Sequence, residues 1–105
     1  LGQVEGFTML DVAEIISYMP QAKAQQAIMN KALEVSEDLQ VEMLTIVSDS
    51  GKRYGNQLNN RQIRRLIELA QSENDELAET AAATMGALEV ENDTLLQLIF
   101  VPETN

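Results

Sequence analysis

The chain has 105 residues, of which 45% are apolar, and a net charge of −10. Its length fits one domain, and its apolar content is typical of a folded protein and excludes a disordered tail. The negative charge disfavours general adhesion to nucleic acid or to an anionic membrane. Only two prolines and five glycines interrupt the chain, and Ala, Leu, Glu and Gln are abundant, so we predict an all-α fold.

No segment approaches the roughly 18 apolar residues that a membrane span needs, and the N-terminus lacks the pattern of a signal peptide. The chain begins with Leu1 rather than Met, so we expect it to be a mature product or a piece of a longer protein. The sequence does not assign a compartment, and the cytoplasm is the favoured location.

The first helix is predicted to begin after Thr8, which can act as its N-cap, with Asp11 completing a capping box. The apolar residues of this helix share one stripe: Met9, Val12, Ile16 and Met19. Pro20 ends the helix. The second helix is expected over about 21–34, with its buried face made of Ala24, Ile28, Ala32 and Val35.

Ser36 is the predicted N-cap of a third helix, and the acids Glu37 and Asp38 lie in its first turn, where the helix dipole favours them. This helix is apolar on most sides, so we expect it to be central and buried. Its apolar residues are Leu39, Val41, Met43, Leu44, Ile46 and Val47. Gly51 is its predicted C-cap, followed by an irregular stretch over 52–60.

Asn59 is the predicted N-cap of a fourth helix, again with a capping box completed by Gln62. The helix is amphipathic. Its apolar face carries Ile63, Leu66, Ile67 and Ala70, and its polar face carries Arg61, Arg64, Arg65 and Glu68. A fifth helix is expected over about 75–90 and a sixth over 94–101.

The sequence Ala-Leu-Glu-Val at 32–35 recurs at 87–90. An aspartate follows each copy at the same distance, Asp38 in the first and Asp93 in the second, and matched apolar positions follow both. We therefore predict a true internal repeat within one domain. Its parts are copy one, about 8–50, a loop, 51–60, and copy two, about 61–101.

The segment Arg-Gln-Ile-Arg-Arg-Leu-Ile-Glu-Leu-Ala occupies 61–70. It is followed by Asn-Asp-Glu-Leu at 74–77 and Thr-Ala-Ala-Ala-Thr-Met-Gly-Ala-Leu at 80–88. Together these segments resemble the two helices of a HEAT-type repeat, and the resemblance is looser over 8–47. The small residues that would allow close helix packing are Ala81, Ala82 and Ala87, with Gly86 expected at the tightest contact.

The resemblance implies a HEAT/armadillo-like stack of about six antiparallel helices, an α-solenoid in which neighbouring units complete each other's core. The interval from 32–35 to 87–90 exceeds the usual length of a HEAT repeat, so a three-helix, armadillo-like grouping remains equally open. Solenoids usually act as binding surfaces or spacers. The implied function is therefore a non-catalytic protein-interaction or scaffold module. The apolar segment 95–101 either folds back on the preceding pair, continues into a longer array, or mediates self-association.

The sequence lacks most of the residue types and motifs that enzymes use in catalysis. There is no His and no Cys, which removes the commonest general base and the soft metal ligands, and there is no glycine-rich phosphate loop. Carboxylates gather at 34–38 and 89–93, where helix N-termini favour them, so capping explains them better than a metal site. We predict no catalytic residue, metal or cofactor. A metal-dependent enzyme that uses carboxylates alone is the remaining enzymatic alternative.

Five of the seven basic residues lie within 52–65, a stretch without any acid, so it carries +5 while the rest of the chain carries −15. The candidate binding residues are Lys52, Arg53, Tyr54, Arg61, Arg64 and Arg65. We expect the three helical arginines to form the rigid part of this surface and Tyr54 its exposed anchor. Charge balance against the acidic helices is the leading interpretation. Next comes an acidic segment of a protein partner, and then nucleic acid or phosphate binding, which the net charge opposes.

Overall fold

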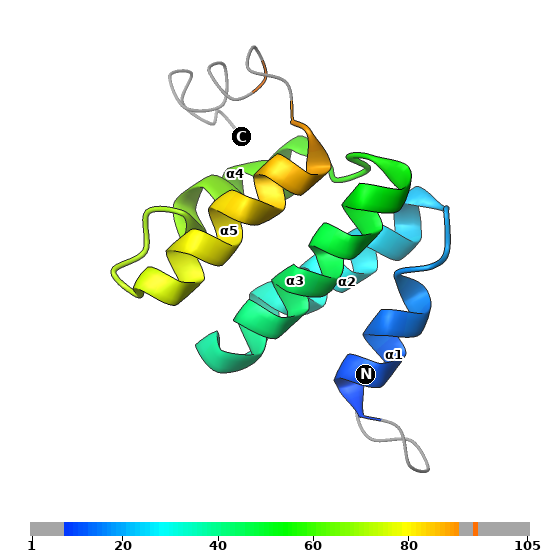
Figure 1. Ribbon diagram of the computed structural model, residues 1–105, viewed down its shortest axis with the longest axis horizontal. Coiled ribbons are helices and arrows are strands. Elements are labelled where there is room, and N and C mark those ends of the chain that lie inside the picture. Colours follow the sequence, from blue (N-terminus) through cyan, green and yellow to red (C-terminus); the bar gives the residue numbers. More distant parts are fainter. Residues whose placement is uncertain (1–7, 91–93, 95–105) are drawn as a thin grey trace.

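The computed structural model describes residues 8–90 and 94 (Figure 1). Within them the chain forms helices and no strand, which confirms the predicted all-α class. The helices are α1 (Met9–Ile16), α2 (Ala22–Glu34), α3 (Glu37–Tyr54), α4 (Asn60–Leu69) and α5 (Asp75–Leu88). None of these described helices has the length and apolar character needed to cross a membrane. The predicted sixth helix, apart from Thr94, lies outside the described residues.

The helices lie in two layers (Figure 1). α1, α3 and α5 lie side by side in front, and α2 and α4 lie behind them. α2 and α3 form one hairpin, α4 and α5 form a second, and the hairpins meet where α3 contacts α5 and where α2 contacts α4. The helices of the first hairpin start at positions 22 and 37, and those of the second at 60 and 75. The distance in sequence between the two helix starts is therefore the same in both hairpins. The predicted repeat of 32–35 at 87–90 remains a prediction, because its second copy extends beyond the described residues.

Both predicted capping boxes are confirmed. At the start of α1, Thr8 Oγ1 accepts a hydrogen bond from the Asp11 amide (3.2 Å), and the Thr8 amide donates to Asp11 Oδ2 (3.1 Å). At the start of α4, Asn59 Oδ1 accepts from the Gln62 amide (2.9 Å), and the Asn59 amide donates to Gln62 Oε1 (3.2 Å). Each box satisfies backbone donors that the first helical turn cannot pair, and so fixes where its helix begins.

α3 is longer than predicted. The helix continues through Gly51, which is buried, and ends at Tyr54. Gly55 is its C-cap, with φ at +76°, and its amide donates to the Gly51 carbonyl oxygen (2.8 Å). The prediction of Gly51 as the C-cap was therefore wrong, because two glycines lie four positions apart and only the second adopts the left-handed backbone that glycine favours. The irregular stretch predicted over 52–60 shrinks to 55–59.

Gly51 lies where α3 crosses the end of α5. A Cβ atom at this position would be 2.7 Å from Leu88 Cδ2 and 3.3 Å from the Ala87 carbonyl oxygen. Gly86, which was predicted to hold the tightest contact, is exposed, and a Cβ there would meet nothing within 4 Å. Ala82 is also exposed. The predicted close contact between helices is therefore present, between α3 and α5, but its glycine is Gly51 of α3 and not Gly86 of α5.

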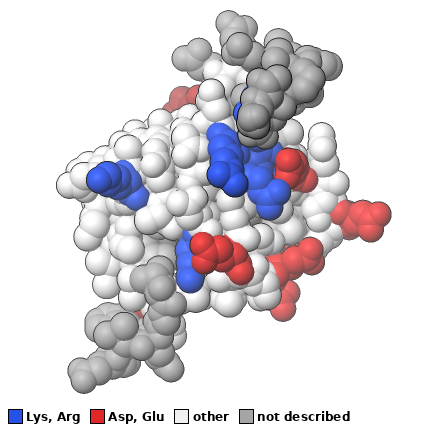
Figure 2. Space-filling view, turned by 180° about the vertical axis from the view of Figure 1, so that it is seen from behind, with Lys and Arg blue, Asp and Glu red and all other residues white. Residues whose placement is uncertain are grey.

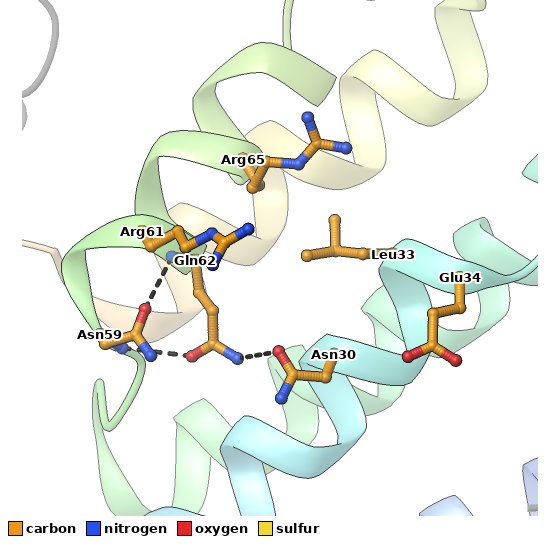
Figure 3. Close-up of a pocket in the computed structure, with 7 residues that line it drawn as sticks. All are labelled: Asn30, Leu33, Glu34, Asn59, Arg61, Gln62 and Arg65. Atoms are coloured by element: carbon orange, nitrogen blue, oxygen red, sulfur yellow. Dashed lines mark hydrogen bonds between the residues drawn. The ribbon is translucent and has the colours of Figure 1, made fainter. Parts of the chain in front are cut away.

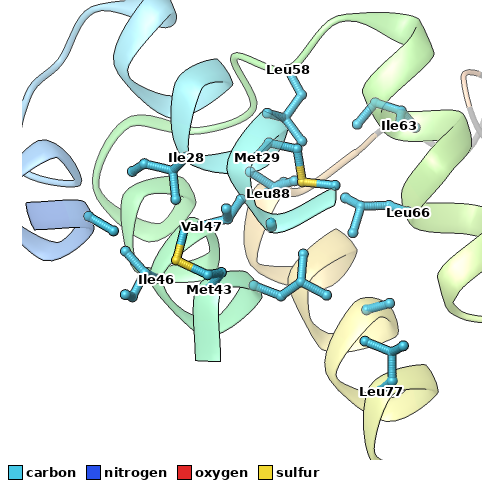
Figure 4. Close-up of a cluster of buried hydrophobic side chains, with 14 residues drawn as sticks. Ile28, Met29, Met43, Ile46, Val47, Leu58, Ile63, Leu66, Leu77 and Leu88 are labelled. Atoms are coloured by element: carbon cyan, nitrogen blue, oxygen red, sulfur yellow. The ribbon is translucent and has the colours of Figure 1, made fainter. Parts of the chain in front are cut away.

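The core between the layers is aliphatic (Figure 4). Its largest fully buried apolar side chains are Ile28, Met29, Met43, Leu44, Val47, Ile63, Leu66, Leu77 and Leu88. The faces predicted for α2 and α3 are largely buried, although Val35, Leu39 and Val41 are only partly so. The stripe predicted for the first helix is wrong in part, because Ala13 is buried whereas Met19 is 44% exposed. α1 ends at Ile16, so Met19 is no longer in helical register with the stripe.

Candidate functional site

The structure divides the basic segment between different places. Lys52 is exposed and lies in a hollow of about 350 Å³ between α3 and α5. Arg53 turns instead toward α1. Arg61 and Arg65 line a hollow between α2 and α4, and Arg64 is half-buried on α4. The segment does not form one patch, because residues 52–54 continue α3 and successive helical residues point in different directions.

Arg53 and Tyr54 fasten the end of α1 to α3. The Arg53 guanidinium lies 3.7 Å from the centre of the Tyr18 ring. Its Nη1 also donates to the carbonyl oxygen (3.3 Å) and to Oγ (3.2 Å) of Ser17. The Tyr54 hydroxyl donates to the Tyr18 carbonyl oxygen (2.5 Å). Tyr54 is thus half-buried with its hydroxyl already used, rather than the exposed anchor predicted from sequence.

The backbone of the loop between α3 and α4 is hydrogen-bonded to α2 at Gly55 and Gln57, whereas Asn56 is exposed. The Gln57 backbone amide donates to Gln25 Oε1 (2.8 Å), and Gln25 Nε2 donates to Ser50 Oγ and to the Gly55 carbonyl oxygen (3.0 Å each). Gln26 Nε2 donates to the Gln57 carbonyl oxygen (2.8 Å). Gln25 is completely buried, so these bonds satisfy a polar side chain that would otherwise destabilise the core. No local pattern marks Gln25 as buried, and sequence reasoning missed it.

Arg61 and Arg65 belong to a hollow of about 570 Å³ between α2 and α4, the α2–α4 groove (Figure 3). Its lining residues are Asn30, Leu33, Glu34, Asn59, Arg61, Gln62 and Arg65. On this back face of the molecule basic side chains gather together, with acidic side chains beside them (Figure 2). The two arginines are four positions apart on α4, so they project from the same face of the helix. The structure thus brings together two of the six predicted site residues at one hollow.

The floor of the groove is a hydrogen-bonded network centred on Gln62, which is only 3% exposed. Gln62 Nε2 donates to Asn30 Oδ1 (2.8 Å; Figure 3). It also donates to the Gln26 carbonyl oxygen (3.0 Å). The same side chain completes the capping box with Asn59. Gln62 therefore ties the start of α4 to α2. Sequence reasoning found its capping role but not this one, because Asn30 belongs to another helix, far away along the chain.

The charges around the groove are unequal. Arg65 Nη1 lies 2.7 Å from Glu68 Oε1, and Lys31 Nζ lies 3.4 Å from Glu34 Oε1. The Arg65–Glu68 pair is exposed, and in the other pair Lys31 is half-buried beside an exposed Glu34. Pairs at the surface contribute at most about 1 kcal/mol, so a ligand can replace them at little cost. Arg61 forms no ion pair with any residue that the structure describes. Two guanidinium groups thus face the groove against one carboxylate.

The described part of the chain contains no group of three or more His, Cys, Asp or Glu side chains placed to hold a metal ion. Comparisons of the chain with protein-family models, with curated proteins and with solved structures find no match. What the groove can bind therefore follows from its own side chains, which include two guanidinium groups, the Glu34 carboxylate, the side-chain amide of Asn30 and the aliphatic wall of Leu33.

Proposed function

We propose that the chain is a non-catalytic, HEAT/armadillo-like helical-repeat module that binds an acidic segment of a partner protein in the α2–α4 groove. The repeat architecture is supported by the two helix hairpins, which lie side by side, share a core and have equally spaced helix starts. The observation that carries the binding proposal is the pair of exposed arginines, Arg61 and Arg65, over a rigid polar floor.

The spacing of the arginines suits two carboxylates. Arg61 and Arg65 are one helical turn apart, which corresponds to about 6 Å along the axis of α4. Alternate residues of an extended peptide are about 6.6 Å apart and point to the same side. Guanidinium groups recognise carboxylates through paired hydrogen bonds. A peptide with acids at positions i and i+2 therefore matches the groove, and an aliphatic side chain nearby can contact Leu33.

Preorganisation favours this binding. The bonds from Gln62 to Asn30 and to the Gln26 carbonyl oxygen hold α4 against α2 before any ligand arrives. Only the arginine side chains then lose freedom on binding, which costs about 0.5–1.5 kcal/mol for each ordered side chain. Nucleic acid would present phosphates to the same arginines. The −10 charge of the chain opposes every anionic ligand, and more strongly the more charges it carries, so a short segment with two carboxylates is favoured over a nucleic acid.

The proposal is tested with a fluorescein-labelled peptide that contains Glu-Leu-Glu and a matched peptide that contains Gln-Leu-Gln. We expect the acidic peptide to bind more tightly, and the variant Arg61→Glu/Arg65→Glu to weaken it by about tenfold or more, since each charged hydrogen bond contributes about 1.5–3 kcal/mol. The matched control, Lys23→Glu/Lys52→Glu, reverses two exposed charges away from the groove. It should change the affinity by less than about threefold, as expected for screened charges.

If the two double variants weakened binding of the acidic peptide equally, the result would contradict specific binding in the α2–α4 groove. Tighter binding of single-stranded DNA than of the acidic peptide would favour the polyanion alternative. Phosphate binding would also be marked by a dependence on log salt of about one unit of slope for each phosphate contact.

A further inference from the structure

The end of α1 carries an apolar surface that the folded hairpins do not use. Among residues 8–90, the exposed large hydrophobic side chains are Ile15 (52%), Tyr18 (63%) and Met19 (44%). All three lie close together in sequence, at the end of α1 and in the turn that follows it, and α1 lies at one edge of the front layer (Figure 1). Single exposed apolar residues are ordinary, but a contiguous group of them marks an interaction surface.

The same face carries negative charge. A hollow of about 500 Å³ is lined by Asp11, Glu14, Ile15 and Tyr18. These positions follow the i, i+3, i+4, i+7 pattern, so they form one face of the helix and of the turn that follows it. α1 contains two carboxylates and no basic residue. The hollow therefore combines apolar walls with an acidic rim, and this is the reverse of the charge at the α2–α4 groove.

The surface is held rigid from behind. Arg53 stacks on the Tyr18 ring and bonds to Ser17, and Tyr54 bonds to the Tyr18 carbonyl oxygen. An isolated helix as short as α1 would be marginal in water, so these contacts and the packing of Ala13 into the core keep α1 in place. A tyrosine fixed in this way offers a large contact area at a low entropic cost, which is why tyrosine is frequent at the energetic centres of interfaces.

We infer that this face of α1 is a second interaction surface, and that its partner is a helix with aliphatic side chains flanked by Lys or Arg. The partner is basic because two carboxylates, Asp11 and Glu14, line the hollow against the single guanidinium of Arg53 on the Tyr18 ring, and because the −10 charge of the chain attracts cations from a distance. The partner is a helix because a helical ridge packs into the groove between the side-chain rows of another helix. A strand would need free backbone donors and acceptors, which the middle of a helix does not offer.

The inference is tested on the full chain with a labelled helical peptide of about 15 residues, long enough to be partly helical. The peptide has leucines on one face and flanking lysines, and its matched partner has glutamates in place of the lysines. We expect the lysine peptide to bind at least about tenfold more tightly, a difference of about 1.4 kcal/mol. Glu14→Lys and Ile15→Ser should each weaken this peptide by about tenfold, while far-UV circular dichroism shows the helices intact.

The matched control is Glu73→Lys, which makes the same charge reversal at an exposed residue of the α4–α5 connection, at the other end of the front layer. It should weaken the lysine peptide by less than about threefold, as expected for a distant screened charge. Equal weakening by Glu73→Lys and Glu14→Lys would overturn the inference, because it would show general attraction to an acidic protein. Equal binding of the lysine and glutamate peptides would also overturn it, as would failure of the wild-type chain to bind the lysine peptide.

A second copy of the chain is the competing occupant. Dimerisation of the wild-type chain in sedimentation experiments, lost in Ile15→Ser and unaffected by the lysine peptide, would assign the surface to self-association and overturn the inference. Arg61→Glu/Arg65→Glu should leave the lysine peptide bound. The experiments therefore distinguish a wrong inference about the α1 surface from a wrong proposal about the α2–α4 groove.

Discussion

At the scale of single residues, two helical glycines have opposite surroundings. A methyl group at Gly51 would press against Leu88 and the Ala87 carbonyl oxygen, whereas one at Gly86 would meet open space. We expect Gly51→Ala to destabilise the fold, because overpacking costs about 1–3 kcal/mol and the gain in helix propensity offsets only about 1 kcal/mol of it. Gly86→Ala should stabilise the fold by about 0.5–1 kcal/mol. Urea denaturation of the two variants measures both changes, and stabilisation by both would show that α3 and α5 can separate without cost.

At the scale of elements, α1 depends on the contacts from the end of α3. In Arg53→Met/Tyr54→Phe the carbonyl oxygens of Ser17 and Tyr18 lose these donors, while most of the side-chain volume remains. Hydrogen bonds of this kind contribute about 0.5–1.5 kcal/mol each, so protection of the α1 amides should fall by about tenfold or more. Hydrogen exchange measures this, and protection in the middle of α3 should not change. Lys52→Met, one position earlier on the same helix, is the control and should leave α1 protected.

The elements show which parts of the fold a sequence can reveal. The starts of α1 and α4 were predicted correctly because their capping boxes join residues only three positions apart. The end of α3 was not, because the role of Gly51 depends on Leu88, which belongs to another helix. The all-helical class followed from composition, which needs no knowledge of contacts.

The candidate site was only partly predictable for the same reason. The basic segment is continuous in sequence, yet helical geometry turns Arg53 toward α1 and leaves Arg61 and Arg65 at the groove. The groove itself depends on the contact between Gln62 and Asn30, and no local sequence pattern predicts this contact. Charge clustering therefore indicated two residues that line the groove but not the surface to which they belong.

At the scale of the whole molecule, the hairpins share one core and should unfold together. Leu88 of α5 is buried in the same cluster as Met43 and Val47 of α3. Leu88→Ala should cost about 2–5 kcal/mol, as expected for truncation of a buried leucine. The two tyrosines, Tyr18 and Tyr54, report on the junction of α1 and α3, whereas far-UV circular dichroism reports on all helices. The two signals should shift to the same lower urea midpoint. Separate midpoints would mean that the junction of α1 and α3 unfolds independently of the other helices.

The contact at Gly51 also has a geometric consequence. In front, α3 and α5 approach through the backbone at Gly51, whereas behind, α2 and α4 are separated by the groove and bridged by long side chains such as Gln62. α3 and α5 therefore pack more closely than α2 and α4. In a repeat array of the kind proposed above, units that are closer on one side than on the other curve toward the closer side. Arg61 and Arg65 would then lie on the convex surface, where a bound acidic segment is open to solvent along its length.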